Sequence, residues 1–266
     1  MIAYIHWDVS PEVFSLGPIT IRWYGLLFAS SFFIGYYLMQ AIYKRENKPL
    51  ANLDALLWHV ILGTVIGARL GHCLFYEPEY YLSNPVEILK IWEGGLASHG
   101  GTAGVFLALW LYSRRHPQEP FGWLADRLTI PTALTATFIR LGNLFNSEIY
   151  GKITTLPWAF VFERVDPHPR HPTQLYEASV YFMLFLLLRY LYRRHFAFYE
   201  RPYRPLGLFL SWVFGWRMVI ELVKEPQAPF EAELPLNMGQ ILSIPLVGLG
   251  LYLLLLTARP TSAAKR

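Results

Sequence analysis

Hydrophobic residues gather in long runs along this chain of 266 residues, and polar residues collect between the runs. A helix that crosses a bilayer needs about 20 largely apolar residues. Windows of this kind fall near residues 20–43, 53–76, 96–113, 124–146, 173–192, 205–223 and 238–257. The pattern therefore predicts an all-α integral membrane protein with seven transmembrane helices. Arg140 lowers the hydropathy of the fourth window, and Arg217 and Glu221 lower that of the sixth.

The composition agrees with a membrane protein, since 54% of the residues are hydrophobic, 17% are aromatic and 16% are charged. Residues 1–17 contain neither a basic leader nor a small-residue cleavage site, so we expect no cleaved signal peptide. The single cysteine, Cys73, excludes an intrachain disulfide, and we expect it to pack within its apolar window. No spacing typical of metal ligands occurs, and the sequence predicts neither a metal nor a cofactor.

The basic residues predict the orientation, because cytoplasmic flanks of membrane helices are enriched in Lys and Arg. With an outer N-terminus, twelve cations fall on inner flanks: Lys44, Arg45, Lys48, Arg114, Arg115, Arg193, Arg194, Arg201, Arg204, Arg259, Lys265 and Arg266. Four fall on outer segments: Lys90, Lys152, Arg164 and Arg170. We therefore expect the N-terminus outside and the C-terminus inside. The net charge of +4 reflects this bias, and we expect no nucleic-acid binding.

Two outer segments are too polar to cross a membrane. Residues 77–95 are rich in acidic and aromatic side chains, and residues 147–172 contain four prolines. We expect the first to be an interfacial arm and the second to be a small head on the outer face. The remaining connections are too short for another domain, so residues 1–266 are expected to form one membrane-embedded domain.

The polar residues within the windows lie mostly toward the predicted outer ends. Such groups are costly in lipid and indicate a site in the outer leaflet. Those toward the outer ends are Arg22, Tyr24, Arg69, His99, Arg140, Asn143, Asn146, His171, Gln174, Tyr176, Glu177, Arg217 and Glu221.

Residues 140–151 read Arg-Leu-Gly-Asn-Leu-Phe-Asn-Ser-Glu-Ile-Tyr-Gly, so a cation, two amides and a carboxylate close an otherwise apolar segment. Arg140, Asn143 and Asn146 are spaced three apart, so they are neighbours on one helix face, and Glu148 follows. The guanidinium could bind a phosphate while the amides orient a headgroup. The alternative is an arginine that extends to the interface, with amides joining helices.

Arg217 and Glu221 are four residues apart and could form a structural ion pair. Two arginines at similar predicted depth, Arg140 and Arg217, could instead hold one phosphodiester together.

His99 begins the third window and is followed by Gly100 and Gly101. A histidine can take a proton from a thiol when geometry and charge assist. Glycines allow a substrate to approach the backbone closely. They also serve ordinary helix packing, and a lone interfacial histidine can be structural.

His171, Gln174 and Tyr176 surround the start of the fifth window, where a helix N-terminus could bind an anion or simply be capped. Tyr24 and Arg69 could be site residues or interfacial anchors.

At these residues the chain resembles the prolipoprotein diacylglyceryl transferase family, bacterial membrane enzymes that start lipoprotein maturation. Residues 140–151 match the family's Arg-x-Gly-Asn-x-x-Asn-x-Glu-x-x-Gly signature, which ends at Gly151. Shorter matches occur in the family's order: Ile21-Arg-Trp-Tyr-Gly, Gly67-Ala-Arg-Leu-Gly, Trp92-Glu-Gly-Gly, His99-Gly-Gly, His171-Pro-Thr-Gln-Leu-Tyr-Glu and Met238-Gly-Gln-Ile-Leu-Ser. Departures from the family's common residues are Ser98, Ile139, Leu144 and Lys224.

The resemblance implies an enzyme of the bacterial inner membrane, with its site toward the outer leaflet and its head in the periplasm. It implies transfer of the diacylglyceryl group from phosphatidylglycerol to the lipobox cysteine thiol at the end of a prolipoprotein signal peptide. Applied to this reaction, the residues suggest that His99 deprotonates the thiol and that Arg140 and Arg217 bind the phosphate. We expect Glu148 and Glu221 to hold these arginines.

Two other classes of protein could also explain polar residues within the membrane helices. A lipid or solute transporter would also place charged residues within its spans, but no internal repeat is visible and the polar residues crowd one end. A phosphatidyltransferase of another kind would be expected to carry acidic metal-binding motifs, and none is found in the sequence.

Overall fold

A computed structural model describes residues 4–17, 19–225 and 236–256. The chain divides into two compact units. Unit 1 comprises Met1–Leu38 and Asp126–Arg266, and unit 2 comprises Met39–Ala125. Arg259, Lys265 and Arg266, which entered the prediction of orientation, lie outside the described residues.

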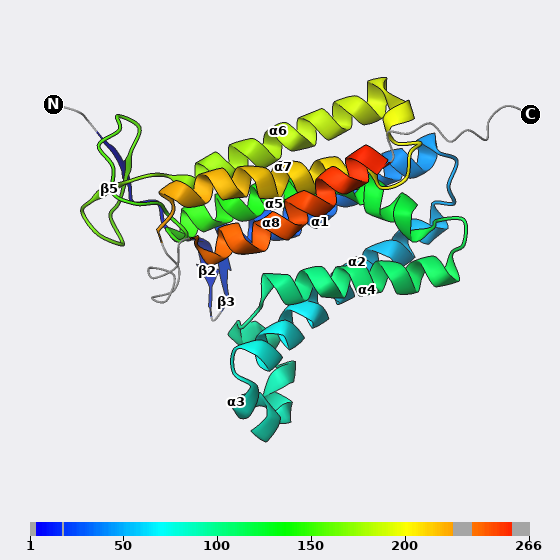
Figure 1. The fold of residues 1–266 in the computed structure, drawn as a ribbon. Helices are drawn as coiled ribbons and strands as arrows, with labels where there is room; N and C mark the ends of the chain where they lie inside the picture. Colours follow the sequence, from blue (N-terminus) through cyan, green and yellow to red (C-terminus); the bar gives the residue numbers. More distant parts are fainter. Residues whose placement is uncertain (1–3, 18, 226–235, 257–266) are drawn as a thin grey trace, which may run out of the picture. The chain divides into compact units, whose positions relative to one another are not determined.

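The described residues contain seven long helices (Figure 1). They are α1 (Trp23–Arg45), α2 (Ala51–Phe75), α4 (Ser98–Arg115), α5 (Phe121–Asn146), α6 (Thr173–Arg194), α7 (Arg204–Ile220) and α8 (Met238–Leu256). Five of them are long and apolar enough to cross a membrane, namely α1, α2, α6, α8 and α7 together with the short η4 (Glu221–Val223). The protein is thus a mostly helical, multi-pass membrane protein, whereas the count of seven spans stays a prediction.

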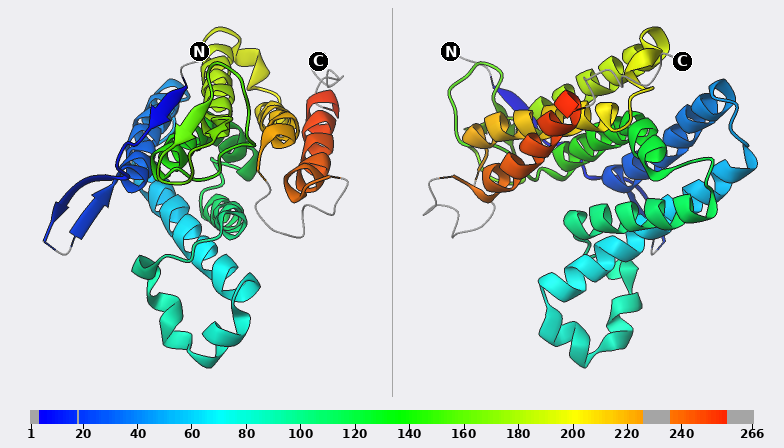
Figure 2. Two further views of the ribbon diagram at one scale, coloured as in Figure 1. Left: turned by 90° about the vertical axis from the view of Figure 1, so that its left-hand side faces the viewer. Right: turned by 45° about the vertical axis from the view of Figure 1, so that its right-hand side comes forward.

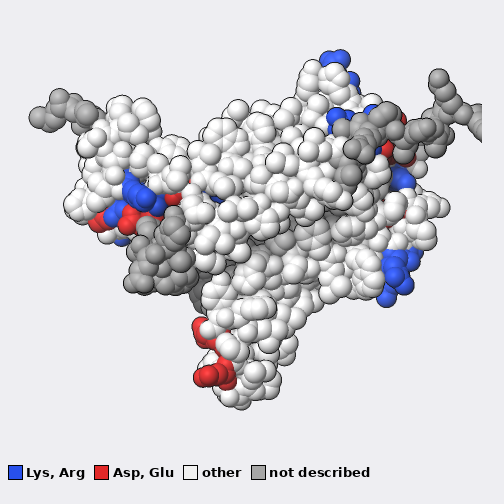
Figure 3. Space-filling model, in the orientation of Figure 1, with Lys and Arg blue, Asp and Glu red and all other residues white. Residues whose placement is uncertain are grey.

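Each long helix begins and ends within three residues of its predicted window. Three of them, α1, α4 and α6, end in a basic pair: Lys44 and Arg45, Arg114 and Arg115, and Arg193 and Arg194. Cations in the last turn interact favourably with the helix dipole. In Figure 3 the surface over α6, α7 and α8 is largely uncharged, and charged side chains lie toward the two ends of these helices.

Unit 1 also contains short strands, which the all-α prediction did not include. In the predicted head, β4 (Phe160–Phe162) pairs with β5 (Pro169–Arg170) and, in parallel, with β1 (Ile5–Trp7). The head segment is therefore completed by residues near the start of the chain. The strands β2 (Glu12–Leu16) and β3 (Ile19–Arg22) form a separate hairpin just before α1, seen projecting in Figure 2.

In unit 2, α2 and α4 pack together along glycines. A Cβ added to Gly100 would lie 2.3 Å from the carbonyl oxygen of Gly67, so a side chain there would force the two helices apart. Beyond these helices, residues 77–95 contain α3 (Pro78–Ser83), η1 (Pro85–Leu89) and η2 (Ile91–Glu93) (Figure 2). The predicted arm is thus made of short helical turns, and its place at a membrane interface stays a prediction.

Buried polar residues also lie away from the predicted outer ends, which the sequence analysis did not expect. Near the start of α5, the Asp126 carboxylate accepts hydrogen bonds from the backbone amides of Tyr203 (2.8 Å) and Leu206 (3.1 Å). It thereby caps the first turn of α7. In unit 2, the fully buried Glu119 accepts bonds of 2.5 Å from the hydroxyls of Tyr43 and Tyr112.

Candidate functional site

The last turns of α5 and the segment after it form a chain of hydrogen bonds. Arg140 Nη1 donates to Asn143 Oδ1 at 3.1 Å, and Asn143 Nδ2 donates to Glu148 Oε1 at 2.7 Å. Asn146 Nδ2 donates to the same Glu148 oxygen at 3.2 Å. The predicted contact of Arg140 with Asn143 is confirmed, and Glu148 fixes both amides.

The turn that carries Glu148 has an unusual backbone. Ser147 and Ile149 have φ angles of 54° and 58°, a left-handed conformation that is strained for a β-branched residue such as isoleucine. The start of α6 holds this turn, because Gln174 Nε2 donates to the Glu148 carbonyl at 2.8 Å. Gly151 closes the turn so tightly that a Cβ there would lie 2.6 Å from the Val223 carbonyl oxygen. Gln174 and Gly151 are thus placed to position the turn.

A buried network of charges links α5 to α6 and to the segment after α7. Arg140 Nε lies 2.9 Å from Glu177 Oε2. Lys224 Nζ lies 3.4 Å from the other oxygen of Glu177 and 3.1 Å from Glu221 Oε1. Arg217 Nε lies 3.4 Å from the same Glu221 oxygen, which confirms the predicted pair. We name these five residues, Arg140, Glu177, Lys224, Glu221 and Arg217, the charge network.

The network corrects one expectation. The carboxylate that pairs with Arg140 is that of Glu177, whereas Glu148 reaches Arg140 through Asn143. Glu177 was noticed in the sequence only as a member of the polar group that opens α6. Lys224 was noticed only as a departure from the family pattern, yet it joins the two carboxylates.

The two arginines are the accessible cations of the network. The side chain of Arg217 is 33% exposed and that of Arg140 is 15% exposed, whereas that of Lys224 is 3% exposed. Within the part of the chain that the structure describes, the Arg217 side chain makes no hydrogen bond, and its buried Nε lacks an acceptor in hydrogen-bonding geometry. Three cations and two carboxylates leave a charge of +1, and Glu148 next to Asn143 brings the total to zero. Because the Arg217 side chain has no hydrogen-bond acceptor among the described residues, its N–H groups stay available for an anionic ligand.

Tyr24 lies beside this site at the start of α1. Its ring and Cα are so close to α5 that a Cβ on Gly142 would meet them at 2.7 and 3.1 Å. The missing side chain of Gly142 therefore lets the start of α1 lie close against α5. Of the two roles that the sequence leaves open for Tyr24, this position favours a site residue over an interfacial anchor.

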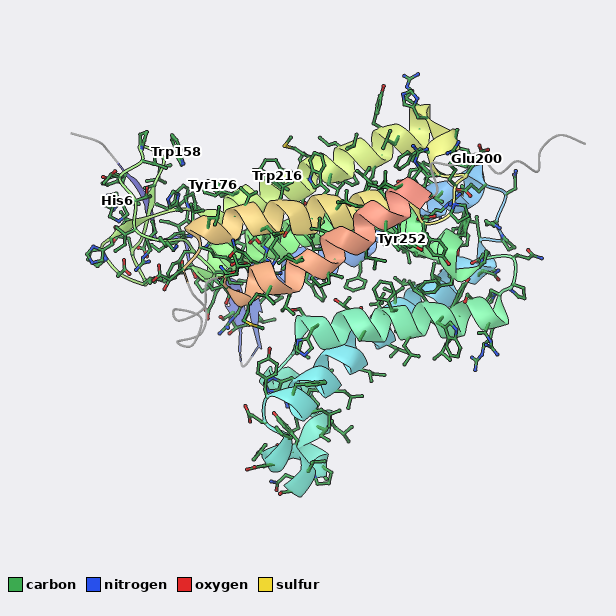
Figure 4. The ribbon with its side chains drawn as sticks, in the orientation of Figure 1. His6, Trp158, Tyr176, Glu200, Trp216 and Tyr252 are labelled. Atoms are coloured by element: carbon green, nitrogen blue, oxygen red, sulfur yellow. The ribbon has the colours of Figure 1, made fainter. Side chains whose placement is uncertain are left out.

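A second polar group lies where the head meets α6. The Tyr176 hydroxyl accepts a hydrogen bond from Trp158 Nε1 at 2.8 Å and lies 3.2 Å from His171 Nδ1. Figure 4 shows Trp158 and Tyr176 at the same end of unit 1, with Glu200 and Tyr252 toward the other end. Partial burial lowers the pKa of His171 below its ordinary value, which favours the neutral ring.

In unit 2, the donors of Arg69 are directed to the predicted arm. They reach the carbonyl oxygens of Glu87 (2.6 Å), Ile88 (2.9 Å) and Gly94 (2.7 Å). The guanidinium also lies over the Tyr81 ring, 5.0 Å from its centroid. Arg69 is almost fully buried, so its contacts favour a role in holding residues 77–95 over direct contact with a substrate.

His99 is exposed at the start of α4 and touches aromatic side chains, with ring centroids 5.6 Å from Phe75 and 5.8 Å from Tyr76. Its side chain makes no hydrogen bond within the described residues, so its ring nitrogens are available to accept a proton. The close packing of α4 on α2 explains why residue 100 is a glycine. A Cβ on Gly101, by contrast, would make an ordinary 3.4 Å contact with Ala68.

Comparisons with known proteins agree on one family. A family model described as "Prolipoprotein diacylglyceryl transferase" matches residues 11–256. The phosphatidylglycerol–prolipoprotein diacylglyceryl transferase of Tolumonas auensis is 54% identical over 255 residues, which cover 96% of this chain and 98% of the relative. The protein of the same name from Chloroherpeton thalassium is 51% identical, covering 99% and 98%. That from Porphyromonas gingivalis is 46% identical, covering 95% and 94%.

Proposed function

This chain belongs to the prolipoprotein diacylglyceryl transferase family, and we propose that it transfers the diacylglyceryl group of phosphatidylglycerol to the lipobox cysteine of bacterial prolipoproteins. The names of its relatives support the two substrates and the group transferred. We further propose that the acceptor is the thiol of the lipobox cysteine and that the product is a thioether. In the structure, the observation that carries it is the charge network, which joins Arg140 and Arg217.

The chemistry calls for fixed positive charge and a route for one proton. The cysteine thiol loses its proton, and the thiolate sulfur attacks the glyceryl carbon that bears the phosphate. A carbon–sulfur bond forms while the carbon–oxygen bond breaks, with its electron pair staying on the phosphate oxygen. Glycerol phosphate leaves with one additional negative charge, which a pair of guanidinium groups would stabilise as it develops.

We assign Arg140 and Arg217 to the phosphate. Glu177, Lys224 and Glu221 would keep the two guanidinium groups in place, since each carboxylate contacts one arginine and the lysine contacts both carboxylates. The negative charge of these partners would also offset the repulsion between two cations that bind one phosphate.

The remaining site residues divide by position. Tyr24, Asn143 and Asn146 would orient the glycerol headgroup, and Glu148 would hold the two amides. Gln174 and Gly151 would support the turn beneath Glu148. His171 and Tyr176 would border the site on the side of the head.

His99 remains our candidate for the thiol base. An unperturbed histidine has a pKa of about 6.5 and a cysteine thiol one of about 8.5, so transfer becomes favourable only if the site stabilises the thiolate. Gly100, Gly101 and Arg69 would serve this part of the protein, Gly100 by packing and Arg69 by holding the arm.

We place the enzyme in the bacterial inner membrane with seven spans, its N-terminus outside and its C-terminus inside. The charge network would then lie toward the outer leaflet, next to the membrane lipid that supplies phosphatidylglycerol. Residues 1–266 would act as one transferase domain, with residues 77–95 as an interfacial arm and residues 147–172 as a periplasmic head. The basic pairs that end α1, α4 and α6 support this orientation.

The test is an assay with purified protein in detergent, phosphatidylglycerol and a lipobox peptide. Mass spectrometry should find the diacylglyceryl adduct on the peptide cysteine. Arg140→Ala should lower the rate at least about 100-fold, as loss of a group that stabilises developing charge commonly does. Arg194→Ala, at the opposite end of α6, is the matched control and should keep the wild-type rate. Absence of any adduct with folded wild-type protein would contradict the proposed function.

A further variant separates the base from lipid binding. His99→Gln should abolish transfer yet still bind phosphatidylglycerol, measured as the lipid-induced rise in melting temperature. Unchanged turnover in this variant would remove the assignment of His99 as the base.

A further inference from the structure

The residues at the start of α8 lie outside the candidate site but contact one of its members, Glu221. Asn237 precedes the helix, and Met238, Gly239 and Gln240 form its first turn. Gln240 donates its backbone N–H to Asn237 Oδ1 at 2.9 Å, and Asn237 donates its own backbone N–H to Gln240 Oε1 at 3.3 Å. Such reciprocal bonds form a capping box, which fixes the first turn of a helix.

This turn also holds the carboxylate of Glu221. Asn237 Nδ2 donates to Glu221 Oε2 at 3.1 Å and to the Glu221 carbonyl at 3.2 Å. A Cβ on Gly239 would lie 2.5 Å from both the carboxyl carbon and Oε1 of Glu221. Gln240 Nε2 donates to the Met218 carbonyl at 3.2 Å and so ties the same turn to α7. The carboxylate is therefore bound on one side and has no room to move on the other.

The two carboxylate oxygens of Glu221 have different partners. Oε2 accepts the bond from Asn237, so Oε1 is directed at Lys224 (3.1 Å) and at Arg217 Nε (3.4 Å). The Arg217 side chain makes no hydrogen bond in the described part of the chain, and its contact with Glu221 is its one ion pair there. The direction of its guanidinium thus depends on where α8 places the Glu221 carboxylate.

From this geometry we infer that Asn237, Gly239 and Gln240 are positioning residues, which orient Arg217 for the phosphate of the lipid substrate by fixing Glu221. The inference rests on the proposed function, and it assigns a role to the Met238-Gly-Gln motif at the start of α8. These residues act through Glu221 and touch no substrate in this scheme.

Gly239→Ala tests the inference with a single methyl group. Alanine favours a helix over glycine, so the change should not weaken α8 itself. The methyl must displace the Glu221 carboxylate, which is the free end of a flexible side chain. Gly248→Ala is the matched control, because it lies in the same helix and a Cβ there meets nothing within 4 Å.

We expect Gly239→Ala to lower kcat at least tenfold, with a change in KM for phosphatidylglycerol below threefold. A misdirected Arg217 would stabilise the negative charge that develops in the transition state less well, and this loss affects kcat more than substrate binding. Gly248→Ala should stay within twofold of wild type in both constants. The melting temperatures of both variants should match that of wild type. A folded Gly239→Ala enzyme with the wild-type kcat would overturn the inference.

Asn237→Asp provides a second test if Gly239→Ala fails to fold. Aspartate is as good an N-cap as asparagine, so the bond from the Gln240 amide is kept. The variant loses the Nδ2 donor and places a second carboxylate beside Glu221. It should fold and lose kcat as Gly239→Ala does, and a wild-type kcat would again overturn the inference. An inactive wild-type enzyme would instead contradict the proposed function, so the two failures are distinct.

Discussion

Arg217 and Lys224 both contact Glu221 Oε1, but their surroundings differ. Lys224 is enclosed between two carboxylates, whereas Arg217 is a third exposed and has donors without partners in the described residues. A guanidinium binds a phosphate through two parallel hydrogen bonds, and an ammonium acts as a point charge.

We therefore expect Arg217→Lys to lower kcat/KM at least about 100-fold, which corresponds to about 3 kcal/mol of lost transition-state stabilisation. Lys224→Arg keeps a cation between the same carboxylates and should cost less than tenfold. Both rates come from the peptide adduct assay. Equal losses in the two variants would mean that Arg217 contributes charge alone.

At the scale of residues, the sequence predicts contacts within one helix and misses contacts between helices. The links from Arg140 to Asn143 and from Arg217 to Glu221 follow from helical spacing. The link from Arg140 to Glu177 joins α5 to α6, and no local spacing encodes it. The same holds for Arg69, which resembles an anchor in the sequence and is bound to the carbonyl groups of the arm in the structure.

Among the elements, α2 and α4 depend on glycines that exclude side chains. Gly100→Ala would place a Cβ 2.3 Å from the Gly67 carbonyl oxygen, so the helices would have to separate. We expect this variant to lose several kcal/mol of stability, as overpacked sites in tight interfaces do. Thermal unfolding in detergent measures the loss.

Gly101→Ala is the neighbouring control, because its Cβ would make an ordinary contact of 3.4 Å with Ala68. It should unfold at nearly the wild-type temperature. If Gly101 also contacts substrate, this variant will lose transferase activity while keeping its fold, which separates packing from binding. Similar melting temperatures for the two variants would contradict the packing role of Gly100.

The guanidinium of Arg170, in β5, forms an ion pair with the carboxylate of Asp166, in the loop between β4 and β5. Arg170 donates to Asp166 Oδ2 from Nη2 at 2.6 Å and from Nε at 3.0 Å. The bonds from this guanidinium lower the pKa of Asp166, and the same contact raises the pKa of Arg170. A carboxyl group with a lowered pKa in the folded state stabilises the fold above its ordinary pKa of about 4, and this contribution is lost as pH falls through the lower folded value.

Asp166→Asn should therefore weaken the hairpin at pH 7 by no more than about 1 kcal/mol, because the pair is partly solvated. Amide hydrogen exchange across residues 160–170 should be up to about fivefold faster than in wild type at pH 7. The difference should shrink below pH 4 as the wild-type carboxyl takes up its proton. A difference that is independent of pH would rule out the charge of Asp166 as its cause.

The long helices could be predicted almost to their ends, and the strands could not. A run of about 20 apolar residues is a strong signal, and charged residues or prolines mark most of its limits. The pairing of β1 with β4 joins residues 5–7 to residues 160–162. Three-residue strands have no periodicity to detect, and their partners are set by the fold of the whole unit.

For the whole molecule, the orientation depends on whether α4 and α5 both cross the membrane. Their length permits it, since 18 and 26 residues of helix extend about 27 and 39 Å. If both cross, α1, α4 and α6 run in the same direction, and all three end in a basic pair. Cytoplasmic enrichment of Lys and Arg then places these three ends inside.

Two single cysteines on either side of α4 test this arrangement. Cys73→Ala provides the background, and we expect it to be active because the reacting thiol comes with the substrate and Cys73 is fully buried. Ser83→Cys and Gln118→Cys are both at exposed positions, the first in the arm and the second between α4 and α5. A membrane-impermeant maleimide added to intact cells should label Ser83→Cys and leave Gln118→Cys unlabelled until the cells are permeabilised. Labelling of both in intact cells would mean that α4 does not cross the membrane. The reverse pattern would mean that the protein is inserted with its N-terminus inside.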